Sequence, residues 1–198
     1  YAQFLTKNDS NYNMEYLFTE DSIKYKDYKF GYTVNCVLDN SDNIEKAFSM
    51  GFLPYTGNIN ASNEVYYMAR SIRINLDDYE RLSENKRIIK SVKSKFNIKV
   101  KLIDKEDFDH SIDFKKFCIN YSKERFINEP LSLERLDLII SRNNYNKIFK
   151  FSIDGIDIGY VLVYHNKNIM HYWFSFYDIK YLNDFPIGKF IMEKVIFY

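Results

Sequence analysis

The sequence has little cysteine, glycine, proline or histidine. Among its 198 residues are 2 Cys, 6 Gly, 3 Pro and 3 His. Cys36 and Cys118 lie far apart in the chain and neither has a second cysteine nearby. This spacing argues against a disulfide framework and against a cysteine-ligated metal site. We therefore expect no bound metal and a reducing, cytoplasmic compartment.

Long apolar segments and excess charge are also missing. No apolar run approaches the roughly 18 residues of a membrane span, and no signal peptide is recognisable, so we expect no membrane partner. The net charge of +1 creates no field that demands a nucleic acid or a membrane as partner. The chain starts at Tyr1 without Met and stops inside a helical pattern, so we expect a fragment truncated at both ends.

Hydrophobic residues make up 46% of the chain and aromatic residues 18%, which is enough for a full core. The length allows one large or two small domains. The best candidate boundary lies near residue 97, which gives an N-terminal region 1–96 and a C-terminal domain 97–198. In the first region we predict strands over 30–38 and 64–74, a helix over 43–50 closed by Gly51, and a helix over 83–96. Residues 1–30 show little periodicity.

The last fifty residues contain three β-branched and aromatic runs, separated by Asp154-Gly155 and by an Asn-rich turn. Such runs predict an antiparallel meander over 147–153, 156–165 and 169–177. In the third run, alternation places His171, Trp173 and Ser175 on one face and Tyr172, Phe174 and Phe176 on the other. A loop through Pro186 and Gly188 then leads into a helical pattern.

Upstream of the meander we expect a strand over 97–104, a helix to Phe126 capped by Ser111 or Asp113, and a helix over 133–142 capped by Ser132. This order resembles the acyl-donor half of GNAT-type acyltransferases. The resemblance implies an α+β or α/β fold with a mostly antiparallel central sheet, lacking its C-terminal strands. A smaller N-terminal α/β region would precede it.

Between Arg81 and Lys101 the chain has eight basic residues and one acid, Glu84, a local net charge of +7. Lys86, Lys90 and Lys93 fall on one face of the predicted helix. A basic helix face can bind a phosphate backbone, and the alternative is a solvated surface.

Two segments resemble the arginyl-tRNA–protein transferase family, which includes leucyl-transferring relatives. In the segment 71–87, Arg73, Tyr79, Lys86 and Arg87 take the positions of the family's Arg-Ile strand, aromatic residue and basic pair. In the segment 174–190, an aromatic-Tyr-Asp sequence is followed by a glycine and a helix, as in the family. The chain differs from the family in lacking a cysteine cluster before the Arg-Ile segment.

The resemblance implies an aminoacyltransferase that moves an amino acid from aminoacyl-tRNA to the N-terminus of a protein or peptide, with no cofactor beyond that co-substrate. It also implies contacts to the donor or substrate, which we assign to Gly188, Lys189, Arg73 and Phe174. It implies a tRNA-binding surface as well, which we assign to Lys86, Arg87, Lys90 and Lys93.

The chemistry of acyl transfer points to the loop after the third run. We predict that Asp178 binds the acceptor ammonium or takes its proton, and that Tyr177 donates a hydrogen bond. The structural alternatives are a strand-ending Asp178 and a helix-entry Gly188. His171 sits within a strand, where a structural histidine is the better interpretation.

Two other functions stay open: an N-acyltransferase that uses acyl-CoA, and a catalytically silent module that binds RNA or peptides. The usual acetyl-CoA signature, Arg/Gln-x-x-Gly-x-Gly/Ala, is absent, because residues 184–190 contain one glycine and no leading Arg.

Overall fold

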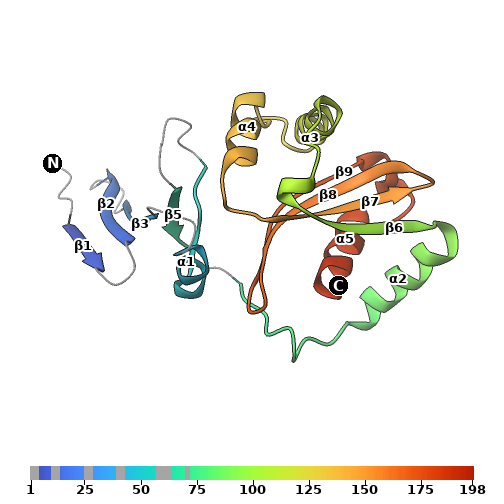
Figure 1. Cartoon of the computed structure of the whole chain (residues 1–198), viewed down its shortest axis with the longest axis horizontal. Coiled ribbons are helices and arrows are strands. Elements are labelled where there is room, and N and C mark those ends of the chain that lie inside the picture. Colours follow the sequence, from blue (N-terminus) through green and yellow to red (C-terminus); the bar gives the residue numbers. More distant parts are fainter. Residues whose placement is uncertain (1–4, 10–13, 25–28, 39–42, 57–63, 70–71) are drawn as a thin grey trace. The chain divides into compact units, whose positions relative to one another are not determined.

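The computed structural model describes residues 5–9, 14–24, 29–38, 43–56, 64–69 and 72–198. Within them the chain is a mixed α+β protein with two antiparallel sheets and five α-helices (Figure 1). It divides into two compact units, residues 1–73 with 141–144 and residues 74–140 with 145–198. This division comes after Arg73 and differs from the boundary expected near residue 97, because helix α2 (Ser83–Lys95) packs with helix α5 (Ile187–Ile196) in the second unit.

The first unit is a five-stranded antiparallel sheet with one helix, α1 (Ile44–Met50). Gly51 ends α1 in the left-handed conformation, with φ of 100°, as the sequence predicts. Residues before 30, where the sequence shows little periodicity, contribute two of the strands. The sheet order is β1 (Leu5–Asp9), β2 (Met14–Lys24), β3 (Lys29–Leu38), β5 (Glu64–Met68) and β4 (Phe52–Pro54).

The strand predicted over 64–74 is shorter than expected, because β5 ends at Met68. Its neighbour β4 has three residues, and the pairing between them runs out at Met68 opposite Phe52. Beyond that point Ile72 is 93% exposed and outside any strand, so the Arg-Ile segment is not strand at residues 72–74. Residues 70–71 of the predicted strand lie outside the described part of the chain.

The second unit contains the predicted meander, and the predicted element order from residue 97 is confirmed. Ser111 and Ser132 cap their helices by accepting from the amides of Phe114 and Arg135. The strands are β6 (Ile98–Asp104), β7 (Lys147–Ile153), β8 (Ile156–His165) and β9 (Met170–Tyr177), and the sheet order is the same. Two 3₁₀ turns, η3 (Lys105–Asp107) and η4 (Ile179–Asn183), follow β6 and β9.

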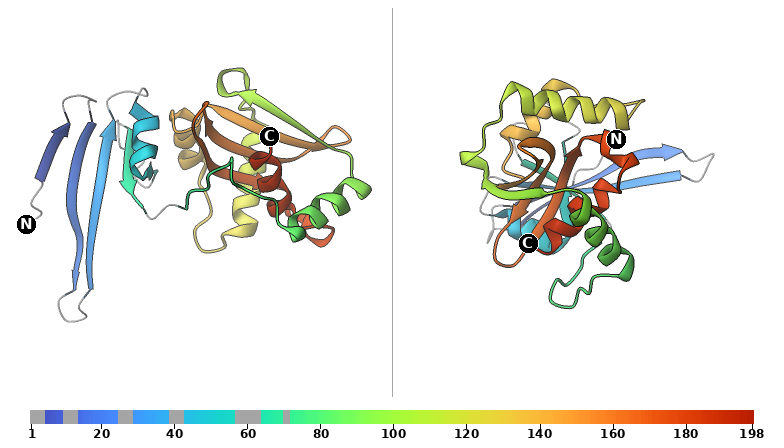
Figure 2. Two further views of the ribbon diagram at one scale, coloured as in Figure 1. Left: turned by 90° about the horizontal axis from the view of Figure 1, so that it is seen from below. Right: turned by 90° about the vertical axis from the view of Figure 1, so that its right-hand side faces the viewer.

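Helices cover both faces of this sheet. Figures 1 and 2 show α3 (Ile112–Arg125) and α4 (Leu133–Ser141) over one face, and α2 with α5 over the other. Each face therefore has its own apolar core. Phe149, Phe151 and Phe190 lie in the core under α2 and α5, and Phe114 and Leu136 lie in the core under α3 and α4.

The face assignment predicted for β9 is wrong before Phe174, because Tyr172 shares a face with Ser175 and His171 lies on the opposite one. Phe174 pairs with Leu162 and Tyr172 with Val163, so Trp173 is an extra residue in a β-bulge. The bulge shifts the alternation by one residue. Tyr172 therefore packs against the α2–α5 core, while Trp173 and Phe174 pack against the α3–α4 core.

Candidate functional site

The end of β9 and the start of α5 bring together several residues that the sequence singled out. β9 ends at Tyr177, η4 follows, and α5 begins at Ile187 after Pro186. Pro186 has no side-chain hydrogen bond that caps the helix. The first amides of an α-helix have no acceptor within the helix, and its dipole favours negative charge there. The amides of Gly188 and Lys189 lie in this first turn.

Gly188 lies directly against the phenol of Tyr177. A Cβ atom at Gly188 would sit 3.3 Å from the phenol oxygen and 3.4 Å from two ring carbons. That spacing is tighter than ordinary van der Waals contact, so a larger side chain would have to displace the ring. The glycine therefore lets a strand-end tyrosine pack on the first turn of α5.

Tyr121 of α3, which the sequence analysis did not single out, is a further member of this group. Its ring centroid lies 4.8 Å from that of Tyr177. Burial raises the pKa of Tyr121, a hydrogen bond with Tyr177 raises it further, and Arg125 opposes the shift. A phenol whose pKa is raised stays protonated at neutral pH and can donate a hydrogen bond. The sequence does contain a signal for this contact. A tyrosine on an apolar helix face is expected to be buried, and a buried phenol needs a hydrogen-bond partner.

Tyr172 extends the group along β9. Burial raises the pKa of Tyr172 to about 12. Tyr172 also contributes to the rise in the pKa of Tyr121. Tyr121, Tyr172 and Tyr177 thus form a group of phenols beside an uncapped helix start.

Asp178 makes local contacts. One carboxylate oxygen accepts from the Lys180 amide at 3.1 Å, which caps η4. The other oxygen lies 2.6 Å from the Lys180 ammonium, and the Lys180 side chain is 63% exposed. The backbone amide of Asp178 donates to Ile158 O. Asp178 thus starts η4 and already holds an ammonium group.

Lys189 and Phe174 have structural contacts as well. The Lys189 ammonium lies 2.9 Å from the Glu84 carboxylate at the start of α2, and it lowers the pKa of Glu84. The ring of Phe174 stacks on Phe176 with centroids 5.8 Å apart, in the core under α3 and α4.

Arg73 lies in the first unit, where its guanidinium donates to Ser49 O at 2.9 Å and to Phe48 O. A cation that binds the last carbonyls of α1 stabilises the helix C-terminus. Gly188 belongs to the second unit, so a cleft that both residues share stays a prediction.

The predicted tRNA-binding residues all lie on α2 and all are exposed (Lys86, Arg87, Lys90 and Lys93). Among the described residues, none of these four has an ion-pair partner within 4.0 Å. Lys99 and Lys101 are also exposed, but Ile98, Val100 and Leu102 of the same strand face the core under α2. Strand alternation therefore turns Lys99 and Lys101 away from α2, and the basic segment does not form one surface.

Sequence reasoning missed Glu193, a buried acid of α5. It binds Arg81 with an Nε to Oε2 distance of 2.8 Å and accepts from Tyr79 and Asn85. Arg81, which precedes α2, is therefore neutralised and does not join the exposed cations of that helix.

Comparisons with protein-family models and with curated proteins find no significant match to this chain. In the part of the chain that the structure describes, no group of three or more His, Cys, Asp or Glu side chains could hold a metal ion. None of the described helices is both long and apolar enough to cross a membrane.

Proposed function

We propose that the second unit is a GNAT-type acyltransferase domain and that the chain moves an amino acid from aminoacyl-tRNA to the N-terminus of a protein or peptide. The observation that carries this proposal is the start of α5. An uncapped helix of 10 residues has a glycine in its first turn, packed against the phenol of Tyr177 at the end of the meander.

The proposed reaction exchanges an ester for an amide. The acceptor amine attacks the ester carbonyl, a C–N bond forms, and the C–O bond to the ribose breaks. The amine loses one proton and the ribose oxygen gains one. Such a site needs donors for the oxyanion, a carboxylate that holds the acceptor ammonium and takes its proton to free the amine, and a group that protonates the leaving oxygen.

The candidate residues can meet these needs. The amides of Gly188 and Lys189 are donors for the oxyanion, and the dipole of α5 favours negative charge at that point. We assign proton donation to the Tyr177 phenol, with Tyr121 as its hydrogen-bonded neighbour. Because its pKa is raised, Tyr121 stays protonated and can donate its hydrogen bond to the Tyr177 oxygen.

Asp178 is the proposed site for the acceptor ammonium. Lys180 now occupies it, with its ammonium 2.6 Å from the carboxylate, so the geometry suits a primary amine. An exposed ion pair of this kind is worth about 0–1 kcal/mol. An acceptor amine can therefore displace Lys180 at small cost. Arg73 and Phe174 stay proposed substrate contacts through the family resemblance alone.

RNA binding is assigned to the exposed cations of α2, Lys86, Arg87, Lys90 and Lys93. Their positive charge is unmatched by acids within ion-pair distance in the described chain. Neutralised phosphates release counterions, which makes this type of binding strong at low salt.

The deciding experiment is transfer of labelled amino acids from charged tRNA to peptides that differ in their N-terminal residue. Label in the peptide, dependent on a free peptide N-terminus, supports the proposal, and a peptide with an acetylated N-terminus is the control. Transfer from acyl-CoA instead of charged tRNA would contradict this proposal and support an N-acyltransferase that uses acyl-CoA. RNA binding without any transfer would leave a binding module.

A further inference from the structure

A cavity of about 460 Å³ opens between the end of α2, the start of β6 and the middle of α5. Its apolar wall includes the half-buried Phe96 and Ile98, which lie in the same lining as the fully buried Val92 and Phe190. A volume of this size lies within the range of small-molecule pockets. The cavity lies at the far end of α2 from Glu84, which binds Lys189.

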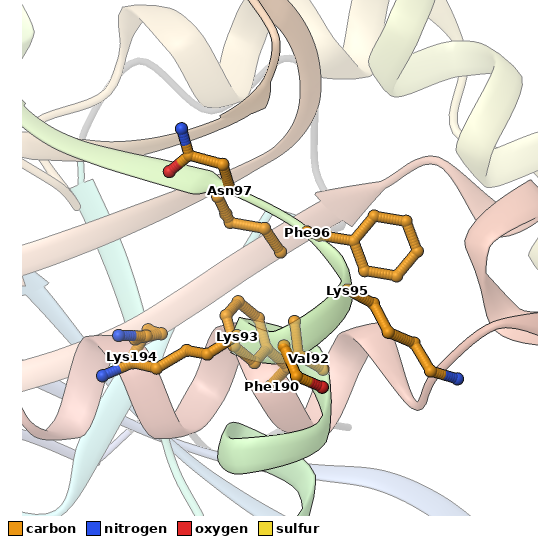
Figure 3. A pocket seen from close by; sticks show the side chains of 9 residues that line it. Val92, Lys93, Lys95, Phe96, Asn97, Phe190 and Lys194 are labelled. Atoms are coloured by element: carbon orange, nitrogen blue, oxygen red, sulfur yellow. The ribbon is translucent and has the colours of Figure 1, made fainter.

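The charged residues that line this cavity are all lysines: Lys93, Lys95 and Lys194. Figure 3 shows the ammonium groups of Lys93 and Lys194 on the same side of the cavity, whereas Lys95 points to the opposite side. Within the described chain, neither Lys93 nor Lys194 has a carboxylate within 4.0 Å. The nearest acid on α5, Glu193, is already bound to Arg81.

The ammonium of Lys194 is partly buried and lies near other cations. Burial lowers its pKa, and the positive charges of Lys93 and Arg81 lower it further. Its stem reaches along Phe190, whose ring centroid lies 5.8 Å from the ammonium. An anion between Lys93 and Lys194 would relieve both the repulsion and the lost solvation.

We propose that this cavity binds a phosphate ester, held between the ammonium groups of Lys93 and Lys194. Two cations match the charge of a phosphate monoester, or of two neighbouring phosphodiesters in an RNA strand, better than that of a single carboxylate, and the cavity has room for more than an isolated ion. The apolar wall beside the lysines suits the organic part of a nucleotide. The ester can belong to an RNA strand or to a mononucleotide.

This inference extends the RNA-binding role proposed for Lys93 to a second element, α5. It needs only an anionic ligand, so it is independent of the transfer reaction. A chain that transfers no amino acid can still bind a phosphate ester here, and a transferase can operate without this cavity. Binding and transfer are therefore measured separately.

The test uses the full chain and three probes: a short fluorescent single-stranded RNA, adenosine 5′-monophosphate and inorganic phosphate. The variants are Lys93→Gln and Lys194→Gln, with Lys99→Gln as the matched control on β6. Loss of one charge-assisted contact should weaken RNA binding roughly tenfold in either variant. Lys99→Gln should change it by less than about twofold, and Lys194→Arg should retain the affinity of the wild type.

Two further readouts exclude a purely structural effect. Lys194→Gln should unfold at the same or a higher temperature than the wild type, because it removes a repelled cation. The log–log salt slope of RNA binding should become shallower by about 0.7 for a single strand when one phosphate contact is lost.

The probes identify the source of the ester. Binding of the mononucleotide that depends on Lys194 indicates a nucleotide site, and binding of the RNA alone indicates a strand. Either result supports the proposal. If Lys93→Gln and Lys194→Gln bind all probes as Lys99→Gln does, or if no probe binds, the proposal is overturned.

Discussion

The Glu193 carboxylate and the Arg81 guanidinium form an ion pair in which Nε lies 2.8 Å from Oε2. The Tyr79 hydroxyl and the Asn85 amide donate to the other carboxylate oxygen at 3.0 Å and 2.5 Å. Glu193 is only 4% exposed. One acidic side chain thus connects α5 to the segment that enters α2, and this ion pair neutralises the charge of Arg81.

Glu193→Gln should destabilise the protein. The change keeps the shape of the side chain but removes the charge that Arg81, Tyr79 and Asn85 share. We expect a loss of about 1–3 kcal/mol in the free energy of unfolding, measured by urea denaturation. Glu84→Gln is the control, because its ion pair with Lys189 is exposed and should contribute nothing measurable. Equal stability of Glu193→Gln and the wild type would contradict the assigned role.

Asp178→Asn should reduce transfer far more than it reduces stability. Removal of one positioned acid–base or charged group typically costs about 10²- to 10⁴-fold in rate. Lys180→Met is the control, because it removes the ion pair but keeps the carboxylate, and it should retain most of the turnover. If both variants lose activity equally, or neither does, Asp178 only starts η4.

Gly188→Ala tests the contact with Tyr177. The new Cβ would lie 3.3 Å from the phenol oxygen, but alanine also favours the helix by about 1 kcal/mol. The change should therefore be about 0.5–1 kcal/mol more favourable in the Tyr177→Phe background, where the closest atom is gone. Urea unfolding of the four proteins measures this coupling, and purely additive effects would disprove the contact.

The larger change Gly188→Val should abolish donor binding, since a branched side chain blocks approach to the amides of the first turn of α5. The meander should stay folded, as judged by circular dichroism. Donor binding at wild-type affinity would place the donor elsewhere.

The triple change Lys86→Glu, Lys90→Glu and Lys93→Glu should weaken tRNA binding strongly. Binding by the wild type should fall steeply with salt, with a log–log slope of about −0.7 to −0.9 per phosphate contact. The double change Lys99→Glu and Lys101→Glu is the control, because strand alternation turns these side chains away from α2. A shallow salt slope with no effect of the triple change would make α2 a solvated surface.

His171 should make the protein less stable in mild acid. Burial lowers its pKa from 6.5 to about 4. The unfolded chain therefore binds a proton before the folded one does, so stability is complete above pH 6.5 and is lost between pH 6.5 and 4. The loss should reach roughly 3 kcal/mol in unfolding experiments across this range.

His171→Gln is the matched variant for this test, since it cannot titrate and should flatten the pH dependence. The pKa of His110 is also lowered, chiefly by burial, so some dependence should remain. If the wild type and His171→Gln follow the same curve, the pKa of His171 is the same in the folded and unfolded chain, which would contradict the prediction.

The sequence by itself determined the local elements of the second unit. The turn between β7 and β8 needs two left-handed residues, and Asp154 and Gly155 adopt φ of 49° and 85°. Ser111 and Ser132 cap their helices for an equally local reason. Each hydroxyl accepts a hydrogen bond from the backbone amide three residues later in the chain. Neighbouring residues decide such features, so a single chain reveals them.

Tertiary structure decided which side chains meet. The bulge at Trp173 depends on the pairing of β9 with β8 and moves Tyr172 to the other core. The contact of Tyr121 with Tyr177 joins α3 to the end of the sheet. Such contacts depend on the register of the sheet and on how the helices pack against it. No periodicity within one segment contains that information.

The same distinction applies to charge. The sequence determined that residues 81–101 carry a net positive charge, and it placed Lys86, Lys90 and Lys93 on one helix face. Only the folded chain decided that Glu193 neutralises Arg81 and that Lys194 joins Lys93 at one cavity. The physical reason is that electrostatic energy depends on distance and burial, and packing sets both between residues far apart in the sequence.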